Sequence, residues 1–178
     1  MKREEAMGQI SFKTGNDVWV PRPSERDDTI LLEAGFAFKE EIRKTLGVHL
    51  DVDDEDLVSF FRGSYSMDGY ELTKAFEDEF HIDGCMGLCE ILDNFFFQVH
   101  MIADKAVKVW IEVNEVKPDH KIGDKVVWAQ SPGREEDFEI TGIDTVRARY
   151  LLFNEAAGHV RTGDGTHGYS VEFEKIDK

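Results

Sequence analysis

The first periodic pattern of apolar residues spans residues 29–46 and stops at Gly47. Apolar side chains recur there at roughly the spacing of a helix, at Leu32, Phe36, Ile42 and Leu46. Glycine commonly ends a helix, because it adopts the left-handed backbone conformation without a steric penalty. The pattern therefore predicts a helix over residues 29–46.

Residues 1–28 show no such periodicity. Two prolines and a cluster of charged residues interrupt the segment VWVPRPSERDD, and both features break regular structure. We expect a loosely structured lead-in over residues 1–28, with one short strand at DVWV, residues 17–20.

An acidic run, DVDDEDLVSFF from Asp51, follows the first predicted helix. A calcium-binding EF-hand loop would require glycine at its sixth position and glutamate at its twelfth. Those positions hold Asp56 and Arg62, so we reject that interpretation. The acidic residues instead suit the start of a short helix near Asp56, because negative charge is favoured at the positive end of the helix dipole.

A second amphipathic pattern follows Ser66. Apolar residues recur every four positions on one side of it, at Leu72, Phe76 and Phe80. Other sides carry Met67, Tyr70, Glu71, Lys74 and Asp78. Ser66, with Asp68 and Gly69 after it, has the chemistry of an N-cap, whose side-chain oxygen accepts a hydrogen bond from an unpaired backbone amide. The pattern predicts an acidic helix capped by Ser66.

A third apolar face extends over residues 85–103 and predicts one further helix. Its members are Cys85, Cys89, Leu92, Phe96, Val99 and Ala103. The helices are expected to share a core, which would contain Phe36, Leu46, Leu57, Leu72, Phe76, Phe80 and Leu92.

Beyond Lys105 the pattern changes to short segments rich in β-branched and aromatic residues, separated by Gly, Pro, Asn and Asp. These segments are AVKVWIEV, KVVWA, DFEITGI, RARYLLFN and YSVEFEKI. They predict a small antiparallel β-sheet or an SH3-like barrel. We therefore expect an α+β protein with a lead-in (residues 1–28), a helical domain (residues 29–104) and a β domain (residues 105–178).

Composition adds a strong and uneven negative charge. The 178 residues include 37 acidic and 21 basic side chains, a formal net charge of −16. Residues 36–105 hold 16 acidic and 6 basic side chains, which gives this segment a net charge of −10. The net charge is −2 for residues 1–35 and −4 for residues 106–178. Such a surface repels nucleic-acid phosphates and attracts basic proteins. We expect a basic protein partner and no direct binding of nucleic acid; the alternative is that the charge serves solubility alone.

The sequence also bears on location. With 41% apolar residues and no long apolar run, it predicts a globular protein that does not span a membrane. The N-terminal residues lack the apolar core of a signal peptide, and two cysteines do not make a disulfide framework. These features favour the cytoplasm and leave the oligomeric state open.

His81, Cys85 and Cys89 are spaced at i, i+4 and i+8, which would align three metal ligands on one continuous helix. Zinc would need a fourth ligand, for which the candidates are Asp83, His100 and Asp93. Gly84 and Gly87 favour a helix that begins after His81, which breaks the alignment. We therefore expect no metal site and two buried structural cysteines.

The segment HVRTGDGTHGYS holds His159, Asp164 and His167 among several glycines. It has no glycine-rich phosphate-binding motif, so a hairpin connection between two strands explains the glycines best. Six histidines and many acids allow dozens of Ser–His–Asp sets, and order in the chain gives no geometry. The sequence thus predicts no catalytic residues and a protein that is not an enzyme.

Residues 36 to about 100 resemble an acyl carrier protein in the order and spacing of several motifs. Carrier proteins have a first helix ending in LGV, a long loop closing with an Asp-Leu pair and a glycine, then DSLD, then an acidic helix of the form xxELxxxLEEEFxI. The matching positions are Leu46-Gly47-Val48, Asp56-Leu57, Gly63, Ser66-Met67-Asp68, Glu71-Leu72, Ala75-Phe76-Glu77, Glu79-Phe80 and Ile82.

This resemblance implies a non-catalytic helical bundle in which Ser66 carries 4′-phosphopantetheine, whose thiol holds acyl groups as thioesters. It also implies that the acidic helix docks to basic patches of partner enzymes. The residues expected at that docking surface are Met67, Asp68, Tyr70, Glu71, Lys74 and Asp78. Three features differ from the family pattern. Tyr65 replaces the usual Asp before the serine, and Lys74 adds a positive charge to the helix. The three phenylalanines at 95–97, with a β domain after them, extend beyond a free-standing carrier protein.

A second hypothesis belongs to a different class of function. An acidic inhibitor or immunity-type protein would neutralise a basic partner by shape and charge. It would use the same acidic residues and would not need Ser66.

Overall fold

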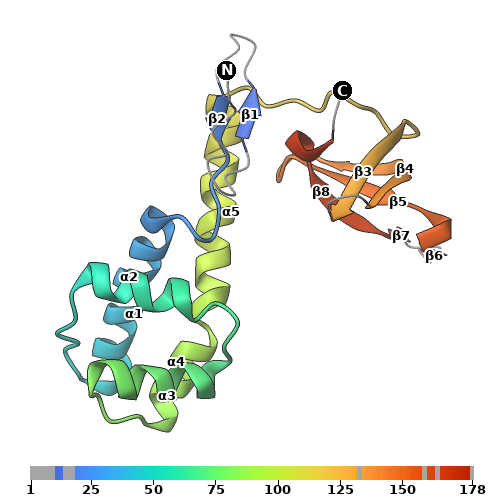
Figure 1. Cartoon of the computed structure of the whole chain (residues 1–178). Coiled ribbons are helices and arrows are strands. Elements are labelled where there is room, and N and C mark those ends of the chain that lie inside the picture. Colours follow the sequence, from blue (N-terminus) through green and yellow to red (C-terminus); the bar gives the residue numbers. More distant parts are fainter. Residues whose placement is uncertain (1–10, 14–18, 132–133, 158–159, 163–164, 177–178) are drawn as a thin grey trace, which may run out of the picture. The chain divides into compact units, whose positions relative to one another are not determined.

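A computed structural model describes residues 11–13, 19–131, 134–157, 160–162 and 165–176 of the chain. The chain divides into two compact units, which are described separately. The helical unit comprises Pro23–Ala106, and the β unit combines the described parts of residues 1–22 and 107–178. Apart from a short N-terminal pair of strands, the helices precede the larger antiparallel sheet, so the predicted α+β class is confirmed (Figure 1).

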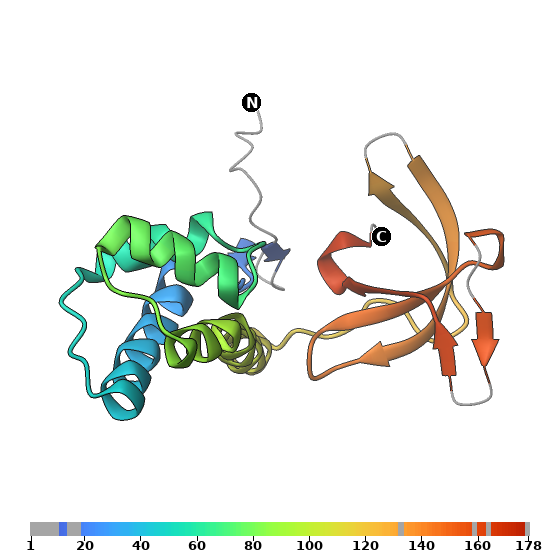
Figure 2. The same ribbon diagram turned by 90° about the horizontal axis from the view of Figure 1, so that it is seen from below.

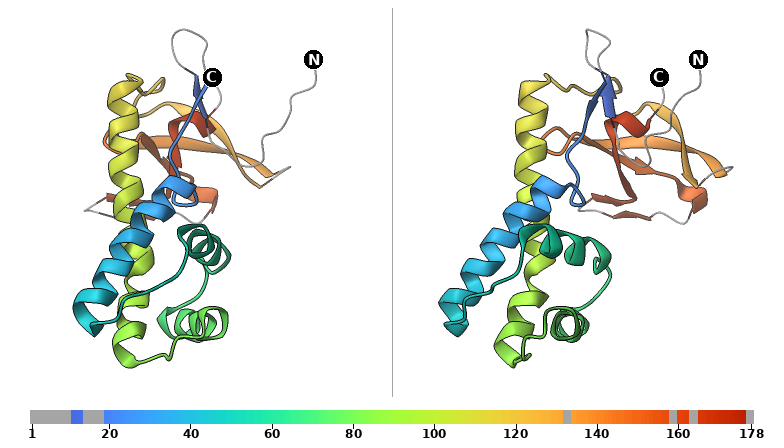
Figure 3. Two further views of the ribbon diagram at one scale, coloured as in Figure 1. Left: turned by 90° about the vertical axis from the view of Figure 1, so that its left-hand side faces the viewer. Right: turned by 60° about the vertical axis from the view of Figure 1, so that its left-hand side comes forward.

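The helical unit is built from α1 (Asp28–Leu46), α2 (Asp54–Gly63), α3 (Gly69–Phe80), α4 (Met86–Asp93) and the first part of α5 (Phe95–Val113). Two views agree that α2 and α3 run across the direction of α1 and α5 (Figures 1 and 3). The C-cap of α1 is Gly47 in the left-handed conformation, with φ 68°, as its position after the last helical residue led us to expect.

Phenylalanines from four helices form the centre of this unit. Phe38 of α1 contacts Phe61, Phe76 and Phe95, with ring centroids 5.3, 5.7 and 5.8 Å away, in edge-to-face geometry. Phe61 and Phe95 stack at 3.5 Å. Offset and edge-to-face aromatic pairs add to the stabilisation from burial, so this cluster joins α1, α2, α3 and α5.

The predicted core is correct in part. Leu57, Leu72, Phe76 and Leu92 are buried, and Leu46 and Phe80 are partly buried against the same cluster. The assignment of Phe36 to the core is wrong, because this side chain is 51% exposed, whereas Phe38 is 1% exposed. Apolar residues occur on two sides of α1, and the helix turns towards the core the side that carries Ile30, Leu31, Ala34, Phe38 and Ile42.

The single helix predicted over residues 85–103 is also wrong. The structure has α4 and α5 there, separated at Asn94. The Asn94 side chain donates a hydrogen bond to the Glu90 carbonyl oxygen at 2.9 Å, and such local bonds compete with helix continuation. The face of α5 that we expected to be buried does point inward at Val99 and Ala103.

The strand predicted at AVKVWIEV is helical, because α5 continues to Val113. Ala103, Val107 and Trp110 are buried at positions i, i+4 and i+7, which is helical spacing. β-branched residues suggested a strand, but tertiary packing of this face outweighs local propensity. The domain boundary expected at residue 105 thus falls inside α5.

In the β unit, a four-stranded antiparallel sheet has the order β3-β4-β5-β8. Its strands are β3 (Lys125–Ser131), β4 (Arg134–Asp144), β5 (Arg149–Phe153) and β8 (Tyr169–Glu172). The register shifts between Ala129 and Ser131 and again between Ile140 and Gly142, and the sheet is visibly curved (Figure 2). Tyr150 lies buried at its centre, and its hydroxyl oxygen accepts hydrogen bonds from the amides of Asp119 and His120.

Two short hairpins and two 3-10 turns complete this unit. The hairpins pair β1 (Ser11–Lys13) with β2 (Trp19–Pro21), and β6 (Val160–Thr162) with β7 (Gly165–His167). The 3-10 turns are η1 (Glu155–Ala157) and η2 (Phe173–Lys175). The hairpin expected in the glycine-rich segment is confirmed, although His159 and Asp164 lie outside the described residues.

The end of the lead-in is anchored in the β unit by Arg22. This arginine is 5% exposed, donates hydrogen bonds to the carbonyl oxygens of Arg147 and Ala148, and forms an ion pair with Glu174 at 3.2 Å. The strand expected at residues 17–20 is confirmed for Trp19 and Val20, which lie in β2, whereas the loosely structured lead-in is wrong for β1 and Arg22. Part of the expected strand, residues 17 and 18, lies outside the described chain.

No helix in the part of the chain that the structure describes is long and apolar enough to cross a membrane.

Candidate functional site

Ser66 lies in a tight turn between α2 and α3. The Met67 amide donates a hydrogen bond to the Ser64 carbonyl oxygen at 3.0 Å, which places Tyr65 and Ser66 at the two central positions of the turn. Ser64 is 4% exposed, and its hydroxyl donates a hydrogen bond to the Phe60 carbonyl oxygen at 2.8 Å. Ser66 itself is exposed. The two serines of this turn thus differ, because Ser64 is buried with its hydroxyl engaged whereas Ser66 is exposed.

The N-cap of α3 is Asp68, so the expectation that Ser66 caps this helix is wrong. The Asp68 carboxylate accepts a hydrogen bond from the Glu71 amide at 2.8 Å, and the Glu71 carboxylate accepts one from the Asp68 amide at 3.2 Å. This is a reciprocal capping box. A capping side chain must come directly before the first helical residue, Gly69, and Ser66 lies two residues too early.

A third carboxylate also occupies this helix end. Asp93 accepts a hydrogen bond from the Gly69 amide at 3.2 Å. A Cβ atom at position 69 would lie 2.6 Å from the Asp93 Cβ, so this close approach requires glycine. Because the amides of residues 68, 69 and 71 already donate to carboxylates, they are engaged and would not bind a phosphate on Ser66.

An open hollow of about 550 Å³ lies beside the turn. It is lined by Ser66, Met67, Tyr70, Glu71 and Lys74. All five residues belong to the set predicted from the sequence. The remaining two, Asp68 and Asp78, are exposed on the same turn and helix. The turn and the exposed side of α3 therefore carry the residues that were expected at the attachment site and the docking surface.

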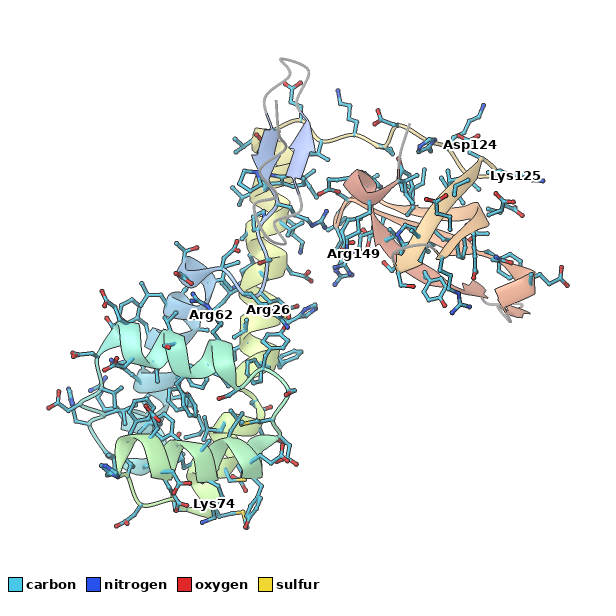
Figure 4. The ribbon with its side chains drawn as sticks, in the orientation of Figure 1. Arg26, Arg62, Lys74, Asp124, Lys125 and Arg149 are labelled. Atoms are coloured by element: carbon cyan, nitrogen blue, oxygen red, sulfur yellow. The ribbon has the colours of Figure 1, made fainter. Side chains whose placement is uncertain are left out.

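The lining combines apolar and charged groups. Tyr70 is 65% exposed and Met67 is 36% exposed, so both offer apolar surface beside the acidic residues. Lys74 donates a hydrogen bond to Glu77 at 2.6 Å, and this contact raises the pKa of the lysine. Figure 4 shows Lys74 on α3, on the outer side of the helical unit. Its charge is therefore partly neutralised by Glu77.

Glu77 connects α3 to the loop that follows it. Its carboxylate accepts hydrogen bonds from Lys74 and from the Gly84 amide, the latter at 2.7 Å. These contacts, with Lys74 first, lower the pKa of Glu77. The carboxylate is thus held in its charged form at the C-terminal end of the candidate docking helix.

The cysteines and His81 do not form the ligand stripe that a continuous helix would give. His81 is the C-cap of α3 with φ 55°, and Cys85 is the N-cap of α4. Cys85 is exposed and Cys89 is half-buried, so the expectation of two buried cysteines is wrong. Within the described ranges, no group of three or more His, Cys, Asp or Glu side chains could hold a metal ion.

Sequence reasoning missed the surroundings of Tyr65. The Tyr65 ring packs against Phe96 of α5 at 4.8 Å, and the Arg26 guanidinium lies 5.3 Å from its centroid. The only available signal was that an aromatic residue replaces the Asp expected before the serine. That signal cannot identify Phe96 and Arg26, which lie 31 and 39 residues away in the sequence.

Comparisons of the chain with protein-family models, with curated proteins and with solved structures give no match. The resemblance to acyl carrier proteins therefore rests on the order and spacing of motifs within residues 36–100.

Proposed function

We propose that the helical unit is a non-catalytic, acyl-carrier-like module in which Ser66 accepts phosphopantetheine and the exposed side of α3 docks to basic partner proteins. The observation that carries the proposal is the position of Ser66. It is exposed in a hydrogen-bonded turn, at the edge of a hollow whose other lining residues, Met67, Tyr70, Glu71 and Lys74, are all expected at the docking surface.

The chemistry requires only an accessible hydroxyl from this chain. A transferase would remove the proton from the Ser66 hydroxyl, and the oxygen would form a phosphodiester with the phosphopantetheine of coenzyme A. Adenosine 3′,5′-bisphosphate would leave with the electrons of the broken pyrophosphate bond. The module supplies no general base, so the transferase must provide one.

The environment of the turn favours docking through side chains and not through the helix dipole. Asp68, Glu71 and Asp93 already engage amides at the start of α3, so an attached phosphate would be solvated or held by the transferase. The exposed charges of Glu71 and Asp78 would attract a basic partner, and Tyr70 would supply apolar contact.

The direct test is intact-mass measurement after co-expression with a permissive phosphopantetheinyl transferase. Wild-type protein is expected to gain one phosphopantetheine arm, and the Ser66→Ala variant to gain none. Ser64 serves as an internal control, because its hydroxyl is engaged with the Phe60 carbonyl oxygen and remains present in that variant. Absence of the arm from the wild type, under conditions that modify an ordinary carrier protein, would reject the attachment.

A second candidate is the acidic inhibitor or immunity-type protein. The carboxylates at the start of α3 favour it. They occupy the backbone amides that could otherwise bind a phosphate on Ser66, and they leave a negative surface beside that serine. Under this alternative, a basic protein partner would bind Ser66→Ala as tightly as wild type. Asp78→Lys would slow its association in low salt, since rim charges act mainly on the association rate.

A further inference from the structure

Tyr65 precedes Ser66 in the turn between α2 and α3. Tyr65 is half-buried and touches two elements that are distant in sequence. Its ring lies 4.8 Å from the Phe96 ring of α5, and the Arg26 guanidinium lies 5.3 Å from its centroid. Aromatic pairs and cation–π contacts at these distances are attractive.

Arg26 is itself held in place by its neighbours. Residues 24–27, here called the strap, precede α1. The Ser24 amide and hydroxyl both donate hydrogen bonds to the Asp27 carboxylate, at 3.0 and 2.8 Å. Glu25 lies 2.7 Å from His100 of α5. Figure 4 shows Arg26 beside α5.

The contacts on Tyr65 act on the turn through its backbone. Tyr65 and Ser66 are the two central residues of a turn closed by one hydrogen bond, from the Met67 amide to the Ser64 carbonyl oxygen. Ser64 is fixed by burial and Asp68 by the capping box. Between these fixed points, Tyr65 is the residue whose side chain reaches Phe96 and Arg26.

We infer that Tyr65 is a positioning residue for Ser66, held by Phe96 and by Arg26 of the strap so that the serine hydroxyl stays at the tip of the turn. This inference rests on the proposed function for its consequence, which is faster modification of Ser66. It assigns a role to Tyr65, one of the positions at which this chain departs from the carrier pattern. The strap and α5 thereby act on Ser66 without touching it.

The first experiment needs no transferase. Amide hydrogen exchange at Met67 reports opening of the turn. Tyr65→Ala is expected to raise that exchange rate about tenfold, because the ring contacts are lost. Tyr65→Phe keeps the ring and should restore the wild-type rate. An unchanged rate in Tyr65→Ala would overturn the inference.

Arginine variants provide a second test without touching the turn. Arg26→Gln is expected to raise Met67 exchange, because the cation over the Tyr65 ring is removed. Arg43→Gln is the matched control, since it removes the same charge at the opposite end of α1, where Arg43 pairs with Glu40. If Arg26→Gln and Arg43→Gln gave equal Met67 exchange rates, the contact from Arg26 of the strap would have no role in holding Tyr65.

Modification by a permissive transferase then connects the turn to Ser66. Initial rates are expected to fall in Tyr65→Ala and to recover in Tyr65→Phe. Tyr65→Asp restores the usual carrier residue but lacks the ring, so its Met67 exchange rate is expected to rise as in Tyr65→Ala; a wild-type exchange rate in this variant would overturn the inference. If no variant and no wild-type protein is modified, the proposed function fails, while the exchange rates still decide whether Tyr65 holds the turn.

Discussion

Two phenylalanines of α1 that are separated by one residue lie in opposite environments. Phe36 is 51% exposed, whereas Phe38 is 1% exposed and contacts the rings of Phe61, Phe76 and Phe95. Both have the same helix propensity and the same hydrophobicity. Their energetic roles therefore depend only on the direction in which each side chain points.

Substitution of these two residues should separate the roles. Phe38→Ala is expected to lower the free energy of unfolding by about 3–5 kcal/mol, because it leaves a cavity in the aromatic cluster. Phe36→Ala should change it by less than about 0.5 kcal/mol, as for other surface substitutions. Urea unfolding followed by circular dichroism measures both. Similar losses in the two variants would contradict the assignment of the buried side of α1.

Glu77 allows a prediction about pH. Its pKa is lowered by the hydrogen bonds from Lys74 and the Gly84 amide, so its contribution to stability is present above the unfolded-state pKa. That contribution is lost as pH falls through the lower folded-state pKa. A nuclear magnetic resonance titration of the Gly84 amide should show a midpoint below the ordinary glutamate value. In Lys74→Met the midpoint should rise; an unmoved midpoint would exclude the lysine as the main cause.

At the scale of elements, the start of α3 is fixed by groups from two helices and a turn. Asp68 and Glu71 close the capping box, and Asp93 of α4 accepts from the Gly69 amide. The end of the helix is connected to the following loop through Glu77 and Gly84. The candidate docking helix is therefore anchored at both ends, which keeps its exposed side in a defined position.

The cap assignment can be tested by two neighbouring substitutions. Asp68→Ala is expected to cost about 1 kcal/mol of stability, because the Glu71 amide loses its acceptor. Ser66→Ala should leave stability nearly unchanged, since Ser66 is exposed and lies before the cap. Thermal unfolding of the two variants measures the difference. If Ser66→Ala lost more stability than Asp68→Ala, Ser66 and not Asp68 would be the cap of α3.

At the scale of the whole molecule, the two units have separate sets of buried residues. The core of the helical unit is centred on phenylalanines, whereas that of the β unit contains Trp110, Phe138 and Tyr150. All three tryptophans of the chain, Trp19, Trp110 and Trp128, belong to the β unit. Tryptophan fluorescence consequently reports on one unit, and helical circular dichroism mainly on the other.

This division predicts different effects for core substitutions in the two units. Arg22→Ala should lower the midpoint of the fluorescence transition, because Glu174 would keep a buried charge without its arginine; breaking such pairs costs about 3–5 kcal/mol. Phe38→Ala should act mainly on the transition seen by circular dichroism. Identical shifts of both signals in both variants would show that the units unfold as one.

The sequence by itself determined the features that depend on local periodicity and chemistry. The apolar spacing of residues 72–80 and the stop at Gly47 predicted α3 and the end of α1, because both signals lie within a few residues of the structure they specify. The short segments after residue 125, which are rich in β-branched and aromatic residues, predicted the sheet for the same reason. The motif order also selected Ser66, Met67 and Glu71, and the helical pattern placed Tyr70 and Lys74 on the side of α3 away from its apolar face; these five residues line the hollow.

Only the tertiary structure decided which of several compatible patterns is used. It turned Phe38 inward in place of Phe36, and it extended α5 through a β-branched segment because Val107 and Trp110 are buried there. It also brought Arg26 and Phe96 to Tyr65 from distant parts of the chain. Local propensities differ by less than about 1 kcal/mol per residue, whereas burial of one large side chain contributes about 1.5–3 kcal/mol, so packing decides wherever the two compete.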